Sequence, residues 1–304
     1  MSKIKIWIRA IRAPFFSVAT IPGIIASFLA YNEGNFNWLY FIISIIIIAG
    51  TNCGINLAND YYDHISKNDE INKYSNPFSG GSRVIQEKML HPKSILIGAI
   101  VSFIVVAIIG LYFTFTVNFN LIWFGLAGIF LGYFYNAPPF KFGYKGLGEF
   151  LVFLMDGPIA TLGTYFLFTG RINLKSVLIS IPPGLLVALV LLINEFPDYF
   201  ADKEVNKKTL IVRLGRKKAS YLYTIVIVLF YLSVIIPVTL GLLPLFLLIV
   251  LINLPIAIKS ILVAIKNYKN EREIFPAQVN TILLAITSGI LLSVGFILDR
   301  ILIK

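Results

Sequence analysis

Long apolar stretches separated by short polar segments run through the whole chain. Each stretch has roughly the 20 residues that a helix needs to cross about 30 Å of hydrocarbon. The pattern predicts nine membrane-spanning helices, at residues 14–31, 38–58, 94–117, 120–136, 147–168, 176–196, 219–240, 242–264 and 279–301. The fourth is short, and only a turn at Gly241 separates the seventh from the eighth. Because the spans leave no room for a soluble domain, we expect one transmembrane domain over residues 1–304.

Composition supports this interpretation. Of the 304 residues, 58% are hydrophobic and 13% are charged, whereas a soluble domain has about 25% charged residues. The fold class is therefore all-α and polytopic, and the lipid bilayer is the first partner that the sequence implies. The single cysteine, Cys53, excludes an intrachain disulfide.

The distribution of basic residues predicts the orientation. If the N-terminus lies in the cytoplasm, 22 of the 26 Lys and Arg residues fall on the inner side, and only Arg171, Lys175, Arg300 and Lys304 fall outside. Such an asymmetry is typical of the positive-inside rule. We predict a multi-pass plasma-membrane protein whose N-terminus and long loops are cytoplasmic. The net charge of +11 then reflects topology, and no nucleic-acid partner is expected.

An acidic cluster follows the second span, where the inner loop 59–93 begins. Asn56, Asn59, Asp60 and Asp63 have i, i+3, i+4, i+7 spacing. If the helix continues through Asp63, all four side chains lie on one face. Asp69 lies just beyond, in the loop.

A second acidic cluster ends the sixth span. Asn194, Asp198 and Asp202 are spaced by four residues, and Pro197 is expected to kink or restart the helix between them. The two clusters are four spans apart and face the same side of the membrane. This repetition suggests two similar four-helix halves followed by a final helix.

Carboxylates next to hydrocarbon are costly, so they usually have a function. Paired carboxylates with amide oxygens suit Mg²⁺, which is commonly shared with substrate phosphates. One cluster alone could equally be a solvated helix end, but two similar clusters on the same face favour a metal site. The two histidines, His64 and His91, are loop residues and provide no zinc site.

Basic residues near the clusters could complete a diphosphate site. Arg12 precedes the first span, Arg83 follows the glycine-containing segment 76–82, and Lys141 lies in the loop after the fourth span. Cations and backbone N–H groups of glycine-rich turns bind phosphates. We favour these three over Lys207 and Lys208, which follow the second cluster.

The two clusters carry a family resemblance. Asn56, Asp60 and Asp63 give the pattern N-x-x-x-D-x-x-D, and Asp198 and Asp202 give D-x-x-x-D. With the number of spans and the long inner loops, the chain resembles the UbiA superfamily of intramembrane prenyltransferases over essentially its whole length.

Within the superfamily, the chain looks most like the 1,4-dihydroxy-2-naphthoate polyprenyltransferase branch. The segments 80–86, 135–139, 146–149 and 157–165 carry that likeness. The ubiquinone-type and haem-type branches more often have a third acidic residue four positions after the second, where this chain has Lys67.

The resemblance implies a mechanism and a set of site residues. Mg²⁺ would be held by the catalytic residues Asp60, Asp63, Asp198 and Asp202 and would bind a polyprenyl diphosphate. Substrate-binding roles are implied for Arg12, Asn56, Asn59, Asp69, Arg83, Tyr135, Lys141 and Asn194. The allylic C–O bond would ionise, and an aromatic acceptor, 1,4-dihydroxy-2-naphthoate in menaquinone biosynthesis, would attack the cation.

Several alternatives stay open at this stage. Tyr135 could stabilise the cation through its ring face or could belong to an interfacial aromatic belt. Asp156, inside the fifth span, could contact the acceptor, act as a base or bind a neighbouring helix. The acceptor could be another quinone-type ring or a glycerol phosphate ether lipid. A secondary transporter is the alternative from another class, although its charges are expected near the midplane. The sequence does not indicate the oligomeric state.

Overall fold

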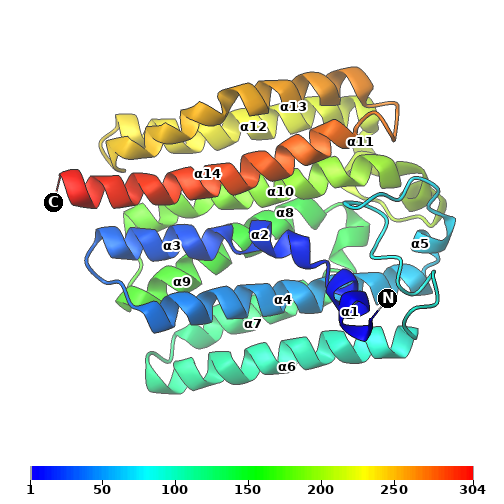
Figure 1. Ribbon diagram of the computed structural model, residues 1–304, viewed down its shortest axis with the longest axis horizontal. Helices are drawn as coiled ribbons and strands as arrows, with labels where there is room; N and C mark the ends of the chain where they lie inside the picture. The colour runs from blue at the N-terminus through cyan, green and yellow to red at the C-terminus, as the bar shows by residue number, and fades with distance from the viewer. Residues whose placement is uncertain (1, 304) are drawn as a thin grey trace.

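The structure, a computed structural model, describes residues 2–303, so Lys304 of the predicted outer set lies outside it. Within that range the chain is helical, without strands, and has one isolated antiparallel bridge between Asn76 and Ser79. The helices lie side by side along one direction (Figure 1). The N-terminus lies at one end, with the short helices α5 (Asn68–Ile71) and α11 (Leu210–Leu214), and the C-terminus lies at the other.

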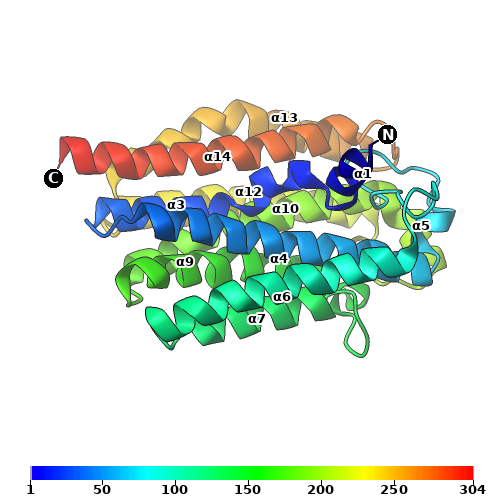
Figure 2. The ribbon, with the colours of Figure 1, turned by 60° about the horizontal axis from the view of Figure 1, so that its bottom comes forward.

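Eight helical segments within residues 2–303 are long and apolar enough to cross a membrane. They are Ala13–Asn32, Trp38–Ile65 (α4), Pro92–Thr116 (α6), Gly148–Thr169, Leu174–Glu204 (α10), Arg216–Thr239 (α12), Leu245–Asn267 and Phe275–Leu302 (α14). This confirms the all-α polytopic fold. The predicted fourth span corresponds to α7 (Leu121–Phe134), which packs beside α4 and α6 (Figure 2). Its 14 residues extend about 21 Å, which is less than the roughly 30 Å of hydrocarbon that a spanning helix crosses. The count of nine spans therefore stays a prediction.

Polar side chains set the helix starts at the end opposite α5. Asn37 caps α4 by accepting hydrogen bonds from the amides of Leu39 and Tyr40. Asn173 and Ser176 form a reciprocal capping box at the start of α10. Such caps satisfy amides that have no partner inside the helix. The connections at this end, residues 33–37 and 170–173, are short.

Helix α10 is the centre of the bundle. It packs against α12, α14, α3 (Ile21–Asn32) and α8 (Gly148–Leu154), and its apolar side chains are buried around most of its circumference. The peripheral helices α6 and α7 instead expose large apolar side chains, which suit a lipid environment.

Both acidic clusters lie on continuous helices. Helix α4 extends to Ile65, beyond the predicted end at residue 58, and α10 extends to Glu204, beyond residue 196. The expected restart at Pro197 is wrong, because α10 contains this proline without interruption. The longer helices carry each acidic stripe into the end of the bundle that holds α5.

Candidate active site

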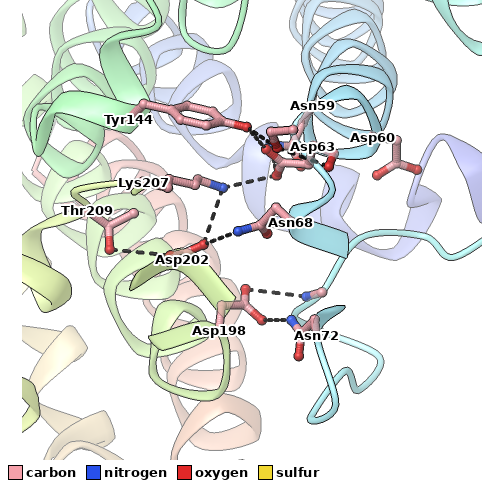
Figure 3. Close-up of polar contacts among 12 residues, drawn as sticks. Asn59, Asp60, Asp63, Asn68, Asn72, Tyr144, Asp198, Asp202, Lys207 and Thr209 are labelled. Carbon is pink, nitrogen blue, oxygen red and sulfur yellow. Dashed lines mark hydrogen bonds and ion pairs between the residues drawn. The ribbon is translucent and has the colours of Figure 1, made fainter. Parts of the chain in front are cut away.

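The first cluster divides into two parts on α4. Asp63 is buried and accepts hydrogen bonds from Asn59 (3.1 Å) and from the Tyr144 hydroxyl. Asp60, also buried, is turned away from Asp63 (Figure 3) and bonds to Arg12 and to the amide and hydroxyl of Ser82. The sequence places both carboxylates on one stripe, but their side chains diverge.

The second cluster on α10 is held by the loop that follows α4. The Asn72 amide donates to Asp198 (2.7 Å), and the backbone N–H of Gly80 donates to the same carboxylate (3.3 Å). Asp202 is buried and accepts hydrogen bonds from Asn68 (2.9 Å) and Thr209 (3.3 Å). Residues from one long loop therefore fix the carboxylates of a distant helix.

Lys207 joins the two clusters. Its Nζ lies 3.0 Å from Asp63 and 3.7 Å from Asp202, and 5.1 Å from the centroid of the Tyr144 ring. Figure 3 shows the lysine reaching between α4 and α10. Burial alone would lower the pKa of Lys207, but the charges of Asp63 and Asp202 outweigh it and raise this pKa well above 10.5. The two clusters therefore face each other across the bundle and share one cation.

A local turn places this lysine. Helix α10 ends at Glu204, and Asn206 follows with a left-handed φ of 58°. The chain then turns back, so that the Lys207 N–H donates to the Asp202 carbonyl (2.8 Å). Asparagine tolerates this conformation better than most residues do.

A cleft of about 190 Å³ lies between the clusters. Its walls include Asp63, Asp69, Asp198 and Asp202 at the loop end and apolar side chains from α4, α8 and α10 further in. The glycines Gly80 and Gly81 form part of the wall, both with positive φ. A Cβ on Gly81 would lie 2.3 Å from a carboxylate oxygen of Asp69, so only glycine fits there.

Negative charge exceeds positive charge around this cleft. Six carboxylates line the cleft, those of Asp63, Asp69, Asp156, Glu195, Asp198 and Asp202, and Asp60 lies beside Arg12. The cations that line it are Arg12 and Lys207, which are 20% and 12% exposed. Within residues 2–303 no group donates a hydrogen bond to the Asp69 carboxylate. Burial, and then the charges of Asp63 and Asp60, raise the pKa of Asp69 well above its usual value.

The donor set fits Mg²⁺. Carboxylate and amide oxygens are its preferred protein ligands, and one or two carboxylates suffice when substrate phosphates supply the rest. No three acidic, histidine or cysteine side chains of the described residues form a closed metal site. The residues thus suit an ion shared with a phosphorylated ligand better than an ion held by the protein alone.

The other predicted site residues divide into two groups. Arg12, Asn56, Asn59, Asp69, Tyr135 and Asn194 all line the cleft. Arg83 and Lys141 do not line it. The Arg83 guanidinium donates to the Asp69 carbonyl, and the Lys141 amine lies 5.4 Å from the centroid of the Tyr144 ring.

Sequence reasoning missed or underrated several residues of this site. The sequence analysis favoured Arg83 and Lys141 over Lys207 as cations of a diphosphate site. In the structure, Lys207 is the largely buried cation that lies between the two clusters. Asn206, which favours a turn back toward α10, was the available signal. Tyr144, Asn68 and Asn72 carry no motif, because their roles depend on how two distant loops meet.

Comparisons with known proteins identify the family of the chain. The sequence profile of the UbiA prenyltransferase family matches residues 19–286. The chain is 29% identical to 2-carboxy-1,4-naphthoquinone phytyltransferase of Synechocystis sp., over 96% of this chain and 93% of that protein. It is 27% identical to 1,4-dihydroxy-2-naphthoate octaprenyltransferase of Bacillus subtilis, over 92% of this chain and 88% of that protein.

A solved structure also shares the fold. It is a UbiA homolog from Archaeoglobus fulgidus bound to GPP and Mg²⁺, with a TM-score of 0.61 and 15% identity. The alignment covers 95% of this chain and 99% of that one. The predicted all-α fold is therefore confirmed as one that a known UbiA homolog adopts.

Proposed function

The chain belongs to the UbiA prenyltransferase family, and from that premise we propose that it transfers a polyprenyl group from prenyl diphosphate to 1,4-dihydroxy-2-naphthoate in menaquinone biosynthesis. The family makes the chain a prenyltransferase, as the sequence predicts. The choice of acceptor is supported by the relatives from Synechocystis and Bacillus subtilis, whose names specify a naphthoquinone or a naphthoate.

One observation carries this proposal: the acidic cleft meets an apolar chamber. The chamber has a volume of about 260 Å³ and lies between α4, α6, α7 and α9 (Ala160–Thr169). Asn52, Ile55, Met155 and Asp156 line both the chamber and the cleft. A prenyl diphosphate is a hydrocarbon chain attached to a charged diphosphate, so the two compartments match its two parts.

The residues at the cleft suit the charge that develops during transfer. Arg12 and Lys207 are positioned to neutralise the diphosphate, and the glycine turn at Gly80 and Gly81 brings backbone close to it. The C–O bond to the allylic carbon breaks, and its electron pair leaves with the diphosphate. The apolar walls exclude water that would otherwise capture the allylic cation.

The acceptor then completes the reaction. Its ring carbon that bears the carboxylate forms a bond to the allylic carbon, and the carboxylate leaves as CO₂, so that charge and electrons balance. When Mg²⁺ is bound, for which we propose Asp60, Asp63, Asp198 and Asp202, it supplies Lewis-acid stabilisation of the departing diphosphate. Asp60 would act together with Arg12 at the edge of the cleft, where the two side chains are paired.

We place the acidic end of the bundle in the cytoplasm of a plasma-membrane protein. The positive-inside asymmetry of the Lys and Arg residues supports this orientation. A soluble acceptor and Mg²⁺ would then reach the cleft from the cytoplasm, while the prenyl chain enters from lipid.

Turnover by the purified protein tests the proposal. With Mg²⁺, prenyl diphosphates of several lengths and 1,4-dihydroxy-2-naphthoate under anaerobic conditions, we expect prenylated naphthoquinol, CO₂ and pyrophosphate. Parallel reactions offer 4-hydroxybenzoate or a glycerol phosphate ether lipid as acceptor. Product from either of these, with none from the naphthoate at any chain length, would overturn the choice of acceptor. The family match leaves the transporter alternative without support.

A further inference from the structure

Two polar side chains at the inner end of the cleft, one buried and one half-buried, have no hydrogen-bond partner among residues 2–303. Asn136 is 0% exposed and lines the cleft, and both its amide nitrogen and its amide oxygen lack hydrogen-bond partners. Asp156 also lines the cleft, and no residue in 2–303 donates a hydrogen bond to it. An unpaired polar group in such surroundings is costly, so a ligand that bonds to both side chains would bind favourably.

The backbone holds Asp156 at this position. Asp156 lies in η3 (Met155–Ile159), a π-helical turn between α8 and α9 that contains Pro158. On one side Gly157 packs against α10 so closely that a Cβ would lie 2.8 Å from the Ser180 carbonyl oxygen. Turns of this kind are frequent at functional sites. The tight contact with α10 fixes Asp156 where the cleft and the apolar chamber meet.

The surroundings suit a flat aromatic ring that carries hydroxyl groups. Ile55, Val152, Met155 and Leu191 supply apolar walls around the two polar side chains. A ring hydroxyl can donate to the Asp156 carboxylate, and the Asn136 amide can both donate and accept. A ring at this point would lie beside the allylic carbon that links the diphosphate to the prenyl chain, where the new bond must form.

We infer that the inner end of the cleft is the acceptor subsite, and that Asp156 and Asn136 bind the hydroxyl groups of a dihydroxylated aromatic acceptor. This inference rests on the proposed function. It assigns Asp156 to acceptor binding rather than to a contact with a neighbouring helix, since no described residue supplies a donor for that contact. The diphosphate residues at the loop end of the cleft are separate from this pair.

Binding measurements with the full-length protein in detergent test the inference. The ligands are 1,4-dihydroxy-2-naphthoate and, separately, a prenyl thiolodiphosphate with Mg²⁺. For Asp156→Leu and for Asn136→Leu, we expect the Kd and KM of the naphthoate to rise about tenfold or more, as the loss of such hydrogen bonds implies. The Kd of the prenyl ligand should stay unchanged.

Glu33→Gln provides a matched control, because Glu33 bonds to Tyr165 (2.5 Å) and Asn173 (3.1 Å) at the opposite end of the bundle. It should leave both affinities at the wild-type level. A ligand comparison guards against misfolding of the variants. The analogues 1-hydroxy-2-naphthoate and 4-hydroxy-2-naphthoate each lack one ring hydroxyl of the acceptor. Wild-type protein should bind at least one of them about tenfold more weakly than the acceptor.

The outcomes separate the two proposals. If wild-type protein prenylates the naphthoate but both leucine variants bind it within about twofold of wild type, Asp156 and Asn136 hold only water and the inference is wrong. Equal affinity of the wild-type protein for the acceptor and for both analogues would also show that the inference is wrong. If wild-type protein neither binds nor prenylates the naphthoate, the proposed acceptor is wrong and the inference falls with it.

Discussion

Replacing Lys207 by methionine isolates the charge that joins the two acidic clusters. Methionine keeps a long unbranched side chain but removes the ammonium group, which lies 3.0 Å from Asp63 and 3.7 Å from Asp202. The side chains are 12%, 5% and 2% exposed, respectively, so water compensates little for the loss. The variant leaves two buried carboxylates facing each other without their shared cation.

The size of the effect follows from this burial. Removing one partner of a buried ion pair costs about 3–5 kcal/mol, because the remaining charge stays desolvated. The pKa of Lys207 is raised above 10.5, so its stabilising charge is present at every pH below 10.5 and is lost only as pH rises through the higher folded-state value. Mg²⁺ binding to the folded state should offset part of the loss, and more in the variant than in wild type.

Thermal unfolding in detergent with EDTA and with Mg²⁺ measures both effects. We expect Lys207→Met to lower the Tm strongly in EDTA and to gain more from Mg²⁺ than wild-type protein gains. Lys208→Met is the matched control, since the Lys208 side chain is exposed, and it should behave as wild type. If Lys207→Met and Lys208→Met unfold alike in EDTA, the shared-cation interpretation is wrong.

Three further predictions concern the cleft and the chamber. Burial, and then the charges of Asp63 and Asp60, raise the pKa of Asp69, so the ionised form of Asp69 destabilises the folded state above pH 3.8. Asp69→Asn should therefore raise the Tm at pH 7 in EDTA, and this gain should disappear as the pH falls toward 3.8. The same variant should weaken Mg²⁺-dependent binding of prenyl diphosphate. Gly81→Ala should abolish turnover, because its Cβ meets Asp69. The control Gly215→Ala shares a positive φ but meets nothing within 4 Å, so it should lower the Tm through a strain of about 1–3 kcal/mol and keep its kcat. Gly128→Leu adds a side chain to the apolar chamber, where space is free; competition between prenyl diphosphates should show a shift toward shorter chains, and an unchanged preference would place the tail elsewhere.

Helical periodicity and charge predicted much of this molecule from the sequence. The spacing of Asn59 and Asp63 on α4, and of Asp198 and Asp202 on α10, indicates two stripes that face the same end of the bundle. Such stripes are local properties of helix geometry. The ends of the helices could not be predicted as well. Polar residues near the end of α4 look like a loop in the sequence, although their contacts with distant residues keep them helical.

The directions of individual side chains could not be predicted in the same way. Asp60 turns to Arg12 and Ser82, which come from segments distant in sequence. Lys207 enters the cleft because of a turn at Asn206 and the packing of two loops. Such contacts depend on tertiary structure, for which spacing along the chain provides no rule. The same reason explains why Asn136, which belongs to no acidic motif, was not singled out.

A structure of the protein with Mg²⁺ and a non-reactive prenyl thiolodiphosphate would test the central claim most directly. We predict that the diphosphate lies in the cleft between Lys207 and the Gly80–Gly81 turn, with carboxylates of α4 and α10 close to its metal. The prenyl chain should pass Asp156 into the apolar chamber. A diphosphate bound outside this cleft, or a chain that leaves the chamber empty, would contradict the account.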